Sequence, residues 1–235
     1  MLARVLEPEV MDTPEEAIDY DQMDHSGVNR LFVDHLIQAA LLADVRFAPK
    51  GPATAPAGAV RSVLDVGTGT AQIPIELARR DVACRIVAID LAQHMLDVGA
   101  RNVAAAGLTD AIRLERVDAK GLPYADGAFD VVMSNSIIHH IPEPIASLRE
   151  MVRLVRPGGL LFVRDLMRPP DLPTLQRLVA TYAGDANAHQ KQMFGDSLHA
   201  ALTLDEIRAL AASCGLPHEA AVPSSDRHWT IAWRR

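Results

Sequence analysis

The sequence predicts an α/β fold in which a mostly parallel β-sheet is covered by helices on both faces. Two observations carry this prediction. Short apolar segments rich in β-branched residues alternate with segments whose apolar residues recur at steps of three and four. The strand-like segments are also mostly apolar, which is typical of parallel strands buried on both sides.

The first expected element is an amphipathic helix over 28–45, which an acidic segment at 12–24 precedes. The range 48–59 has three prolines and two glycines among its alanines and indicates a linker. We therefore divide the chain into an N-terminal helical segment at 1–45, a linker at 46–61 and a main domain at 62–235 with an insertion at about 166–202.

The main domain alternates strands and helices. The expected strands are 62–66, 85–89, 112–117, 129–134 and 160–165. The expected helices are 73–80, 93–106, 144–155, 172–182 and 204–212, the last opening with a capping box at Thr203 and Glu206. An antiparallel pair within 219–233 would add edge strands to the sheet.

Length and composition favour one domain with a sizeable core, since 49% of the 235 residues are hydrophobic. The 23 basic and 30 acidic residues give a net charge of −7, and no Lys/Arg cluster forms a phosphate-binding stripe, so we expect no nucleic-acid partner. No apolar run approaches the roughly 20 residues that span a bilayer, and the acidic N-terminus is unlike a secretory leader. Cys84 and Cys214 lie far apart, so we expect reduced thiols, a cytoplasmic location and no membrane partner.

The strongest motif is VLDVGTGTA at 63–71, a buried strand that contains Asp65 and leads through a glycine-rich turn into a helix. Gly67 and Gly69 let the backbone approach a ligand closely, and the following helix directs free N–H groups toward it. The next strand ends in Asp90, whose carboxylate can accept from both hydroxyls of a ribose. These features predict a ligand that contains ribose, bound at the carboxyl ends of the strands.

Four motifs in order carry a family resemblance over 63–165: VLDVGTGTA, VAIDLAQHML, VDAKGLPYADGAFDVVMSNSIIHHI and LREMVRLVRPGGLLFVRDL. Together they resemble the Rossmann-like (class I) S-adenosylmethionine-dependent methyltransferases, in particular the small-molecule methyltransferase subfamily. The family has a third glycine where this chain has Ala71, a mild departure because alanine still permits close helix packing. The resemblance implies a three-layer sandwich with a seven-stranded, mostly parallel sheet, an antiparallel C-terminal edge pair and an N-terminal helical lid. It also implies S-adenosylmethionine as cofactor and a small-molecule acceptor.

Carried over position by position, the resemblance implies a set of cofactor-binding residues. They are Asp65, Gly67, Thr68 and Gly69 around the methionine moiety, Asp90 at the ribose, Leu91, Met95, Asp118 and Ala119 at the adenine, and Asn135 at the ligand amino group. The lid resemblance adds Tyr20 as a cofactor contact and Arg30 as a partner of the cofactor carboxylate. Plainer interpretations exist: Leu91 and Met95 could be core, Asp118 a helix cap and Arg30 a member of surface ion pairs.

The candidate catalytic residues are His139 and His140, which follow the fourth strand where the family's acceptor-facing residues lie. An imidazole that titrates near neutrality suits proton removal from an acceptor. Against this, adjacent histidines on a short helix are expected to point away from each other. Asp165 and the insertion would complete the acceptor pocket, with His189, Gln190, Met193, Phe194 and His199 as lining candidates. The nine histidines show no metal-ligand spacing, so no metal is expected.

Two alternatives to a methyltransferase stay open, and a nucleic-acid acceptor is disfavoured. An NAD-dependent oxidoreductase is distant, because Gln72 stands where its fingerprint needs a glycine and Asp65 interrupts its apolar strand. A non-catalytic S-adenosylmethionine or nucleoside binder, or a partner-activated subunit, would have an acceptor pocket plugged by the insertion. The sequence Ser134-Asn135-Ser136-Ile137 departs from the motif of enzymes that methylate nucleic-acid bases. We expect a monomer or homodimer, and the acceptor atom is left open.

Overall fold

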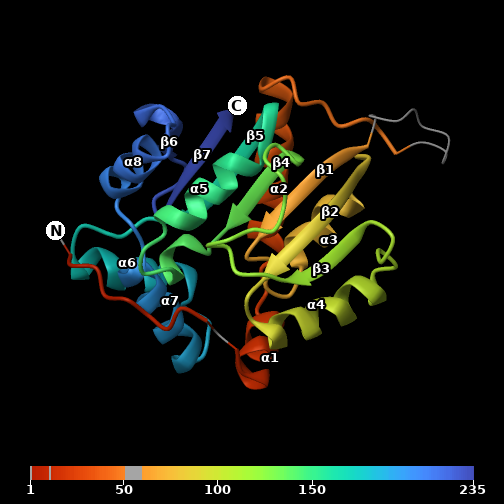
Figure 1. Cartoon of the computed structure of the whole chain (residues 1–235). Helices are drawn as coiled ribbons and strands as arrows, with labels where there is room; N and C mark the ends of the chain where they lie inside the picture. The colour runs from red at the N-terminus through yellow and green to blue at the C-terminus, as the bar shows by residue number, and fades with distance from the viewer. Residues whose placement is uncertain (1, 11, 51–59) are drawn as a thin grey trace. The chain divides into compact units, whose positions relative to one another are not determined.

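A computed structural model describes residues 2–10, 12–50 and 60–235 (Figure 1). The linker expected at 46–61 falls mainly on 51–59, which lies outside the described residues.

The described residues form a seven-stranded mixed sheet with the strand order β3-β2-β1-β4-β5-β7-β6. The strands are β1 (Arg61–Val66), β2 (Cys84–Asp90), β3 (Ile112–Arg116), β4 (Phe129–Asn135), β5 (Val155–Leu166), β6 (Ala221–Pro223) and β7 (His228–Arg234). β1 pairs in parallel with β2 and β4, β2 pairs in parallel with β3, and β6 pairs antiparallel with β7. The predicted parallel sheet with an antiparallel edge pair is confirmed.

The strand order reverses between β1 and β4, because the chain extends from β1 to β2 and β3 on one side and then returns to place β4 on the other. Ligands of open α/β sheets bind at such a switch point, outside the carboxyl ends of the strands. In this chain those ends are Val66 of β1, Asp90 of β2 and Asn135 of β4.

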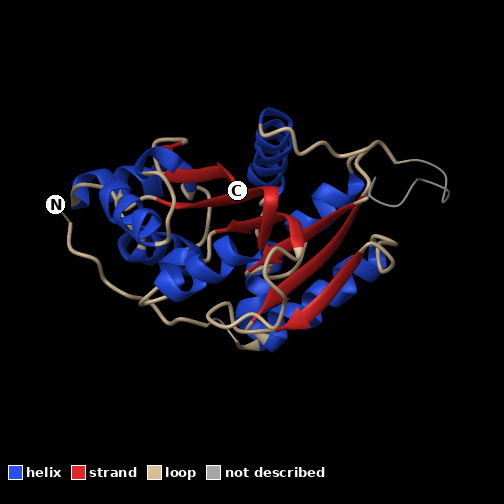
Figure 2. Ribbon diagram, turned by 45° about the horizontal axis from the view of Figure 1, so that its top comes forward, coloured by secondary structure: helices blue, strands red, loops and turns tan. Residues whose placement is uncertain are grey.

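Helices flank the sheet (Figure 2). They are α1 (Pro14–Gln22), α2 (Ser26–Leu42), α3 (Gln72–Arg79), α4 (Gln93–Ala105), α5 (Ile145–Leu154), α6 (Leu172–Tyr182), α7 (Ala188–Ala200) and α8 (Leu204–Ser213), with short 3-10 helices η1 (Ile138–His140) and η2 (His218–Ala220). The sequence analysis did not predict α1 and α7. Both have weak apolar periodicity and are held by capping boxes, Thr13 with Glu16 and Asn187 with Gln190.

The fifth strand starts earlier than expected. It was expected to begin at residue 160, and the preceding Pro157-Gly158-Gly159 has the composition of a turn. In the structure the amide of Gly158 donates to the carbonyl of Arg235 at 2.8 Å, and the amide of Arg235 donates to the carbonyl of Gly159 at 3.0 Å. Pairing with Arg235 thus keeps this segment in the strand, although Gly158 has a left-handed φ of 77°.

The described residues divide into two compact units. The glycine-turn unit comprises the described residues of Val10–Asn135, Ala146–Phe162 and Ala232–Arg235. The insertion unit comprises those of Met1–Glu9, Ser136–Ile145 and Val163–Ile231. The predicted N-terminal segment is therefore shared: its first residues group with the insertion unit, and α1 and α2 group with the glycine turn.

Each unit has an apolar core. In the glycine-turn unit, α2 buries Phe32, Val33 and Leu36 on one face, and the Phe32 ring meets the Phe162 ring edge to face at 5.2 Å. In the insertion unit, the buried core residues are Leu166, Leu175, Leu178, Leu198 and Ala201. Among the described residues, no helix combines the length and apolar character needed to cross a bilayer.

Candidate active site

The turn after β1 is built on left-handed backbone. Gly67, Gly69 and Ala71 have φ angles of 75°, 54° and 63°. Glycine adopts such angles freely, but a residue with a β-carbon pays roughly 1 kcal/mol or more. Ala71 stands where the family has its third glycine, so this departure leaves local strain directly before α3 in addition to allowing close packing.

Buried polar atoms of the turn lack partners. Oδ2 of Asp65 and the hydroxyl groups of Thr68 and Thr70 are buried and have no hydrogen-bond partner among the described residues. Burial raises the pKa of Asp65 to about 7, and the Asp90 carboxylate acts in the same direction. Unpartnered buried polar groups are costly, so this cluster suits a polar ligand that would supply the missing partners.

Asp90 ties the turn to the second strand. Its carboxylate accepts from the amide of Gly69 at 2.8 Å and from the amide of Ala92 at 2.9 Å. Burial raises the pKa of Asp90, and these backbone hydrogen bonds offset part of the effect. The sequence analysis gave Asp90 only a ligand role, whereas the structure gives it a supporting role in the turn as well.

Tyr20 lies against the glycine turn. A β-carbon built on Gly69 would be 3.6 Å from Cε1 of Tyr20, and Tyr20 packs in a cluster with Met95 and Ala92. Burial raises the pKa of Tyr20 to about 12, with the carboxylates of Asp90 and Asp65 acting the same way. The residue expected to contact the cofactor is thus next to the turn, and the contact itself stays a prediction.

A polar network, which the sequence analysis missed, joins the helices around the turn. Asn29 is buried and donates to Oε1 of Gln72 at 3.1 Å, and Gln72 in turn donates to Oδ1 of Asp21 at 3.1 Å. Asn102 donates to the same Asp21 oxygen at 2.8 Å and to the carbonyl of Thr70 at 3.1 Å. The predicted residue Arg30, next to Asn29, is exposed on α2, so its role stays a prediction.

The remaining cofactor candidates lie at or just after the ends of strands, except Met95, which is on α4. Met95 and Ala119 are buried, while Leu91 and Asn135 are half-buried. Asp118 accepts from the amide of Lys120 at 2.9 Å, as a turn cap would. Asp118 therefore caps a turn instead of a helix, and its ligand role stays a prediction.

The insertion unit contains a His–Asp pair. Nδ1 of His139 lies 2.5 Å from Oδ1 of Asp165, and both side chains are buried. The amides of Ile138, His139 and Leu166 also donate to the Asp165 carboxylate, at 2.5, 3.2 and 2.6 Å. Because Asp165 accepts on the Nδ1 side, Nε2 is the nitrogen of His139 that faces other groups.

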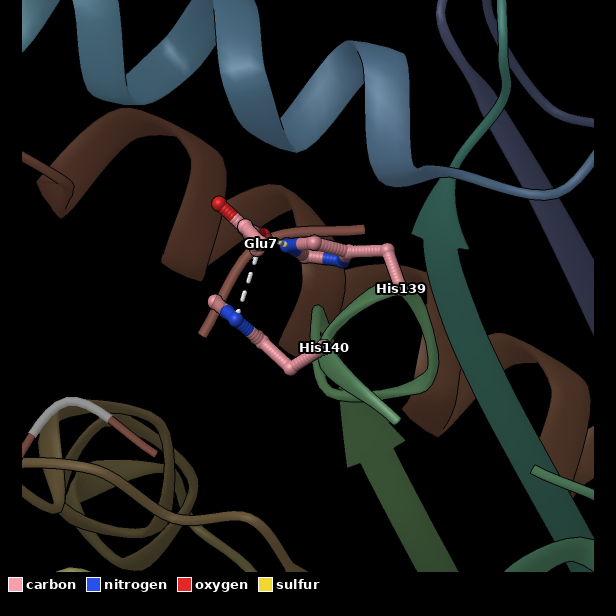
Figure 3. Close-up of side chains that lie close together, drawn as sticks. All are labelled: Glu7, His139 and His140. Atoms are coloured by element: carbon pink, nitrogen blue, oxygen red, sulfur yellow. Dashed lines mark ion pairs between the residues drawn. The ribbon is translucent and has the colours of Figure 1, made fainter. Parts of the chain in front are cut away.

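The group beside that nitrogen is Glu7 (Figure 3). Its Oε1 lies 3.4 Å from Nε2 of His139 and 3.1 Å from Nδ1 of His140. The hydroxyl of Ser197 also donates to the Glu7 carboxylate and lies 3.2 Å from Oε1 and 3.3 Å from Oε2. The expectation that the two histidines point apart is wrong: their ring centroids are 4.2 Å apart, because both rings turn toward Glu7.

Arg4 holds the loop that carries the histidines. Its guanidinium donates to the carbonyls of His139, Ile141 and Pro142 at 3.2, 3.0 and 3.0 Å, and to that of Ala200 at 2.6 Å. Neither Arg4 nor Glu7 was predicted as a site residue, since no local motif surrounds them. Their contacts arise only when the first residues of the chain pack on η1 and α7.

The pKa values of the two histidines are shifted in opposite directions. Burial lowers the pKa of His139, but the Asp165 carboxylate outweighs this effect and leaves the pKa above its usual value. Burial and the neighbouring His139 lower the pKa of His140 to about 3. Burial also raises the pKa of Glu7, and His139 opposes that shift. His140 is therefore neutral at physiological pH, and His139 forms a charge-stabilised pair with Asp165.

The lining candidates in the insertion play different parts. Gln190 caps the start of α7, Phe194 packs against the apolar core, and His189 is exposed. His199 lines an open groove of about 770 Å³ between α6 and α7, and Met193 is half-buried. All five lie on α7, and their role in lining an acceptor pocket stays a prediction.

Comparison with known proteins agrees with the fold and the motifs. A family model described as a methyltransferase domain matches residues 64–163. The 27-O-demethylrifamycin SV methyltransferase of Amycolatopsis mediterranei (strain S699) is 29% identical over 177 residues, which cover 74% of this chain and 61% of that protein. This relative and seven others are matched over 37–65% of their own length.

Two solved structures share the fold at low identity. A SAM dependent methyltransferase from Aquifex aeolicus aligns with a TM-score of 0.62 at 16% identity, covering 94% of this chain and 98% of its own. The plantazolicin methyltransferase BamL, solved with a triazolic desmethylPZN analog and SAH, aligns with a TM-score of 0.64 at 17% identity, covering 86% and 68%. With the family match over the glycine turn and the strands that follow it, these findings lead to one conclusion. Residues 64–163 are similar to a methyltransferase domain, and the fold of the chain is that of solved methyltransferases.

Proposed function

We propose that this chain transfers the methyl group of S-adenosylmethionine to a small-molecule acceptor whose attacking atom carries a proton. The observation that carries the proposal is the glycine turn. It combines left-handed glycines, an acidic residue at the end of β2 and the buried, unpartnered Oδ2 of Asp65. A ligand with an ammonium group and a ribose would satisfy both acids.

The residues at the turn fit S-adenosylmethionine part by part. Asp65 would accept from the ammonium group, which would also favour its ionised form despite burial. Each Asp90 oxygen accepts one backbone amide and keeps a further lone pair for a ribose hydroxyl. Met95 and Leu91 would flank the adenine, and Tyr20 would cover the cofactor from α1.

When bound, the cofactor supplies a methyl group on a positively charged sulfur, which is already activated for transfer. The chain's own task is then to align the acceptor and to take its proton. Among the described residues of the insertion unit, His139 is best built for the second task. Asp165 fixes the ring through Nδ1 and stabilises the imidazolium that forms when Nε2 accepts a proton.

Glu7 must move away before His139 can act as a base, because the Glu7 carboxylate lies 3.4 Å from the nitrogen that would receive the proton. A hydroxyl or amine of the acceptor would have to take the place of that carboxylate next to Nε2. If Glu7 stays in place instead, the chain is the non-catalytic binder that the sequence left open as an alternative.

The named relatives support a small-molecule acceptor. The Amycolatopsis mediterranei protein is named for a rifamycin and BamL for plantazolicin, and neither name refers to a nucleic acid or a protein. The net charge of −7 of this chain supports the same class of acceptor.

Calorimetry and isotope transfer test the proposal. We expect S-adenosylhomocysteine to bind the purified chain at about −8 kcal/mol, which is a micromolar affinity, and NAD to give no heat. With S-adenosylmethionine labelled in the methyl group, label should enter the small-molecule fraction of a cell extract, and His139→Ala should slow its entry. Binding of NAD without S-adenosylhomocysteine would overturn the proposal. Cofactor binding without transfer of label to any fraction would favour the alternative, a non-catalytic S-adenosylmethionine binder.

A further inference from the structure

The cluster of Glu7, His139 and His140 has the composition and spacing of a metal site. One ligand atom from each residue lies within 4.8 Å of the other two. The distances from Oε1 of Glu7 to Nε2 of His139 and Nδ1 of His140 are 3.4 and 3.1 Å. Ligands at about 2.0–2.1 Å from a tetrahedral zinc ion lie roughly 3.3 Å from one another, so these two separations already suit zinc.

The hydrogen-bond pattern around the two histidines also suits a cation. Nδ1 of His140 is buried and makes no hydrogen bond among the described residues. Oε1 of Glu7 lies only 3.1 Å from this nitrogen, but the two atoms are not aligned as in a hydrogen bond. A buried ring nitrogen without a hydrogen-bond partner can offer its lone pair to a metal. Asp165 lies on the Nδ1 side of His139, so Nε2 is the nitrogen that faces Glu7 and could coordinate an ion.

The surroundings resemble the outer shell of known zinc sites. A metal-binding histidine usually donates its other N–H to a carboxylate, which orients the ring and increases its basicity. Asp165 stands in that position for His139, and the hydroxyl of Ser197 holds the Glu7 carboxylate. The charges of Glu7 and Asp165 favour a dication, while Arg4, the nearby guanidinium, directs its donors at backbone carbonyls of the loop.

We propose that Glu7, His139 and His140 bind one divalent zinc-class ion through Oε1, Nε2 and Nδ1, with Asp165 orienting His139. Three protein ligands leave one position open for water or for a hydroxyl group. The proposal does not rest on the proposed methyl transfer. The zinc site would nevertheless affect methyl transfer. Zinc and a proton compete for the same lone pair of His139, so bound zinc prevents His139 from accepting a proton.

The test is a titration of chelator-treated full-length protein with zinc chloride in a calorimeter, without cofactor. We expect one ion per chain. Glu7→Gln and His140→Asn should each weaken binding by at least about tenfold, which is the loss that even an outer partner of a ligand typically causes. The matched control is His94→Asn, because His94 pairs with Asp12 at 3.0 Å in the other unit and should leave zinc affinity unchanged.

A second readout keeps folding and function separate from metal binding. Cobalt chloride should give the intense visible absorption of a four-coordinate ion in the wild type and in His94→Asn, and lose it in Glu7→Gln. S-adenosylhomocysteine should bind Glu7→Gln as tightly as the wild type, which shows that the variant is folded. The absence of zinc binding by the wild type would overturn the proposal. Zinc binding that both ligand variants retain would overturn it as well, since the ion would then lie elsewhere.

Discussion

Replacing Asp65 by asparagine should stabilise the protein, and should do so more at high pH than at low pH. Asp65 is 2% exposed, Oδ2 of its carboxyl has no hydrogen-bond partner among the described residues, and burial raises its pKa from 3.8 to about 7. The folded protein therefore holds the proton of Asp65 more tightly than the unfolded chain does. The stability that this group contributes is present below about pH 4 and is lost as the pH rises through about 7.

The size of the effect follows from the two pKa values. At about 1.36 kcal/mol per pKa unit, the loss is roughly 1.7 kcal/mol at pH 5 and approaches roughly 4 kcal/mol at pH 8. Asparagine has the same shape as aspartic acid and does not titrate, so Asp65→Asn avoids this loss. We expect the stability advantage of Asp65→Asn over the wild type to grow by about 2–3 kcal/mol between pH 5 and pH 8.

Urea unfolding of both proteins at a series of pH values measures this difference. The matched control is Asp130→Asn, because Asp130 is also buried but is paired with Arg61 at 3.0 Å and with Arg156 at 2.7 Å. Burial alone would raise the pKa of Asp130, yet these partners and Ser62 leave it below its usual value. Asp130→Asn should therefore destabilise the protein, and more at pH 8 than at pH 4.

The reasoning fails if Asp65→Asn and the wild type show the same dependence of stability on pH. It also fails if the advantage of the variant shrinks toward high pH. The cofactor gives an independent check, since Asp65→Asn should bind S-adenosylhomocysteine more weakly: the variant cannot offer a negative charge to the ammonium group. Gained stability with lost affinity is the pattern expected of a buried charge kept for binding.

Three further predictions concern other parts of the structure. Asp90→Ala removes the acceptor of the Gly69 and Ala92 amides and should cost about 1.5–3 kcal/mol per hydrogen bond. Asp90→Asn keeps one acceptor and should lose less stability in thermal unfolding and less affinity for S-adenosylhomocysteine in calorimetry. Arg4→Ala frees four backbone carbonyls and should lower the unfolding free energy by about 1–3 kcal/mol; an unchanged urea midpoint would contradict the bracing role of Arg4. Residues 12–29 should gain protection from hydrogen exchange when S-adenosylhomocysteine is added, and equal exchange with and without ligand would remove Tyr20 from the site.

The cofactor side of the site was predictable because its signals are local. Gly67 and Gly69 lie in one turn, and the acids lie at or next to the carboxyl ends of neighbouring strands. Strand order alone therefore brings Asp65 and Asp90 to the same edge of the sheet. The second use of Asp90, as an acceptor for Gly69, was not predictable. A sequence shows that a carboxylate is present, and only packing shows which donors reach it.

The histidine side depends on residues that are distant in sequence. Glu7 and His139 are separated by 132 positions, and Asp165 and Ser197 come from two further segments. No motif surrounds Glu7, and its burial comes from packing of the first residues against η1 and α7. The analysis therefore identified His139 and His140 by their place after β4 but misjudged the direction of their rings.

The sequence by itself determined the α/β class, the order of the elements and the glycine turn, because apolar periodicity and glycine positions act over stretches of a few to some thirty residues. The tertiary structure decided which polar groups meet: the network of Asn29, Gln72 and Asp21, and the cluster of Glu7 with His139. Hydrophobic patterning specifies which side chains are buried, but it carries no information about the partner each buried polar atom finds. That choice is made only when segments far apart in the chain pack together, because a hydrogen bond or ion pair depends on distances of a few ångströms.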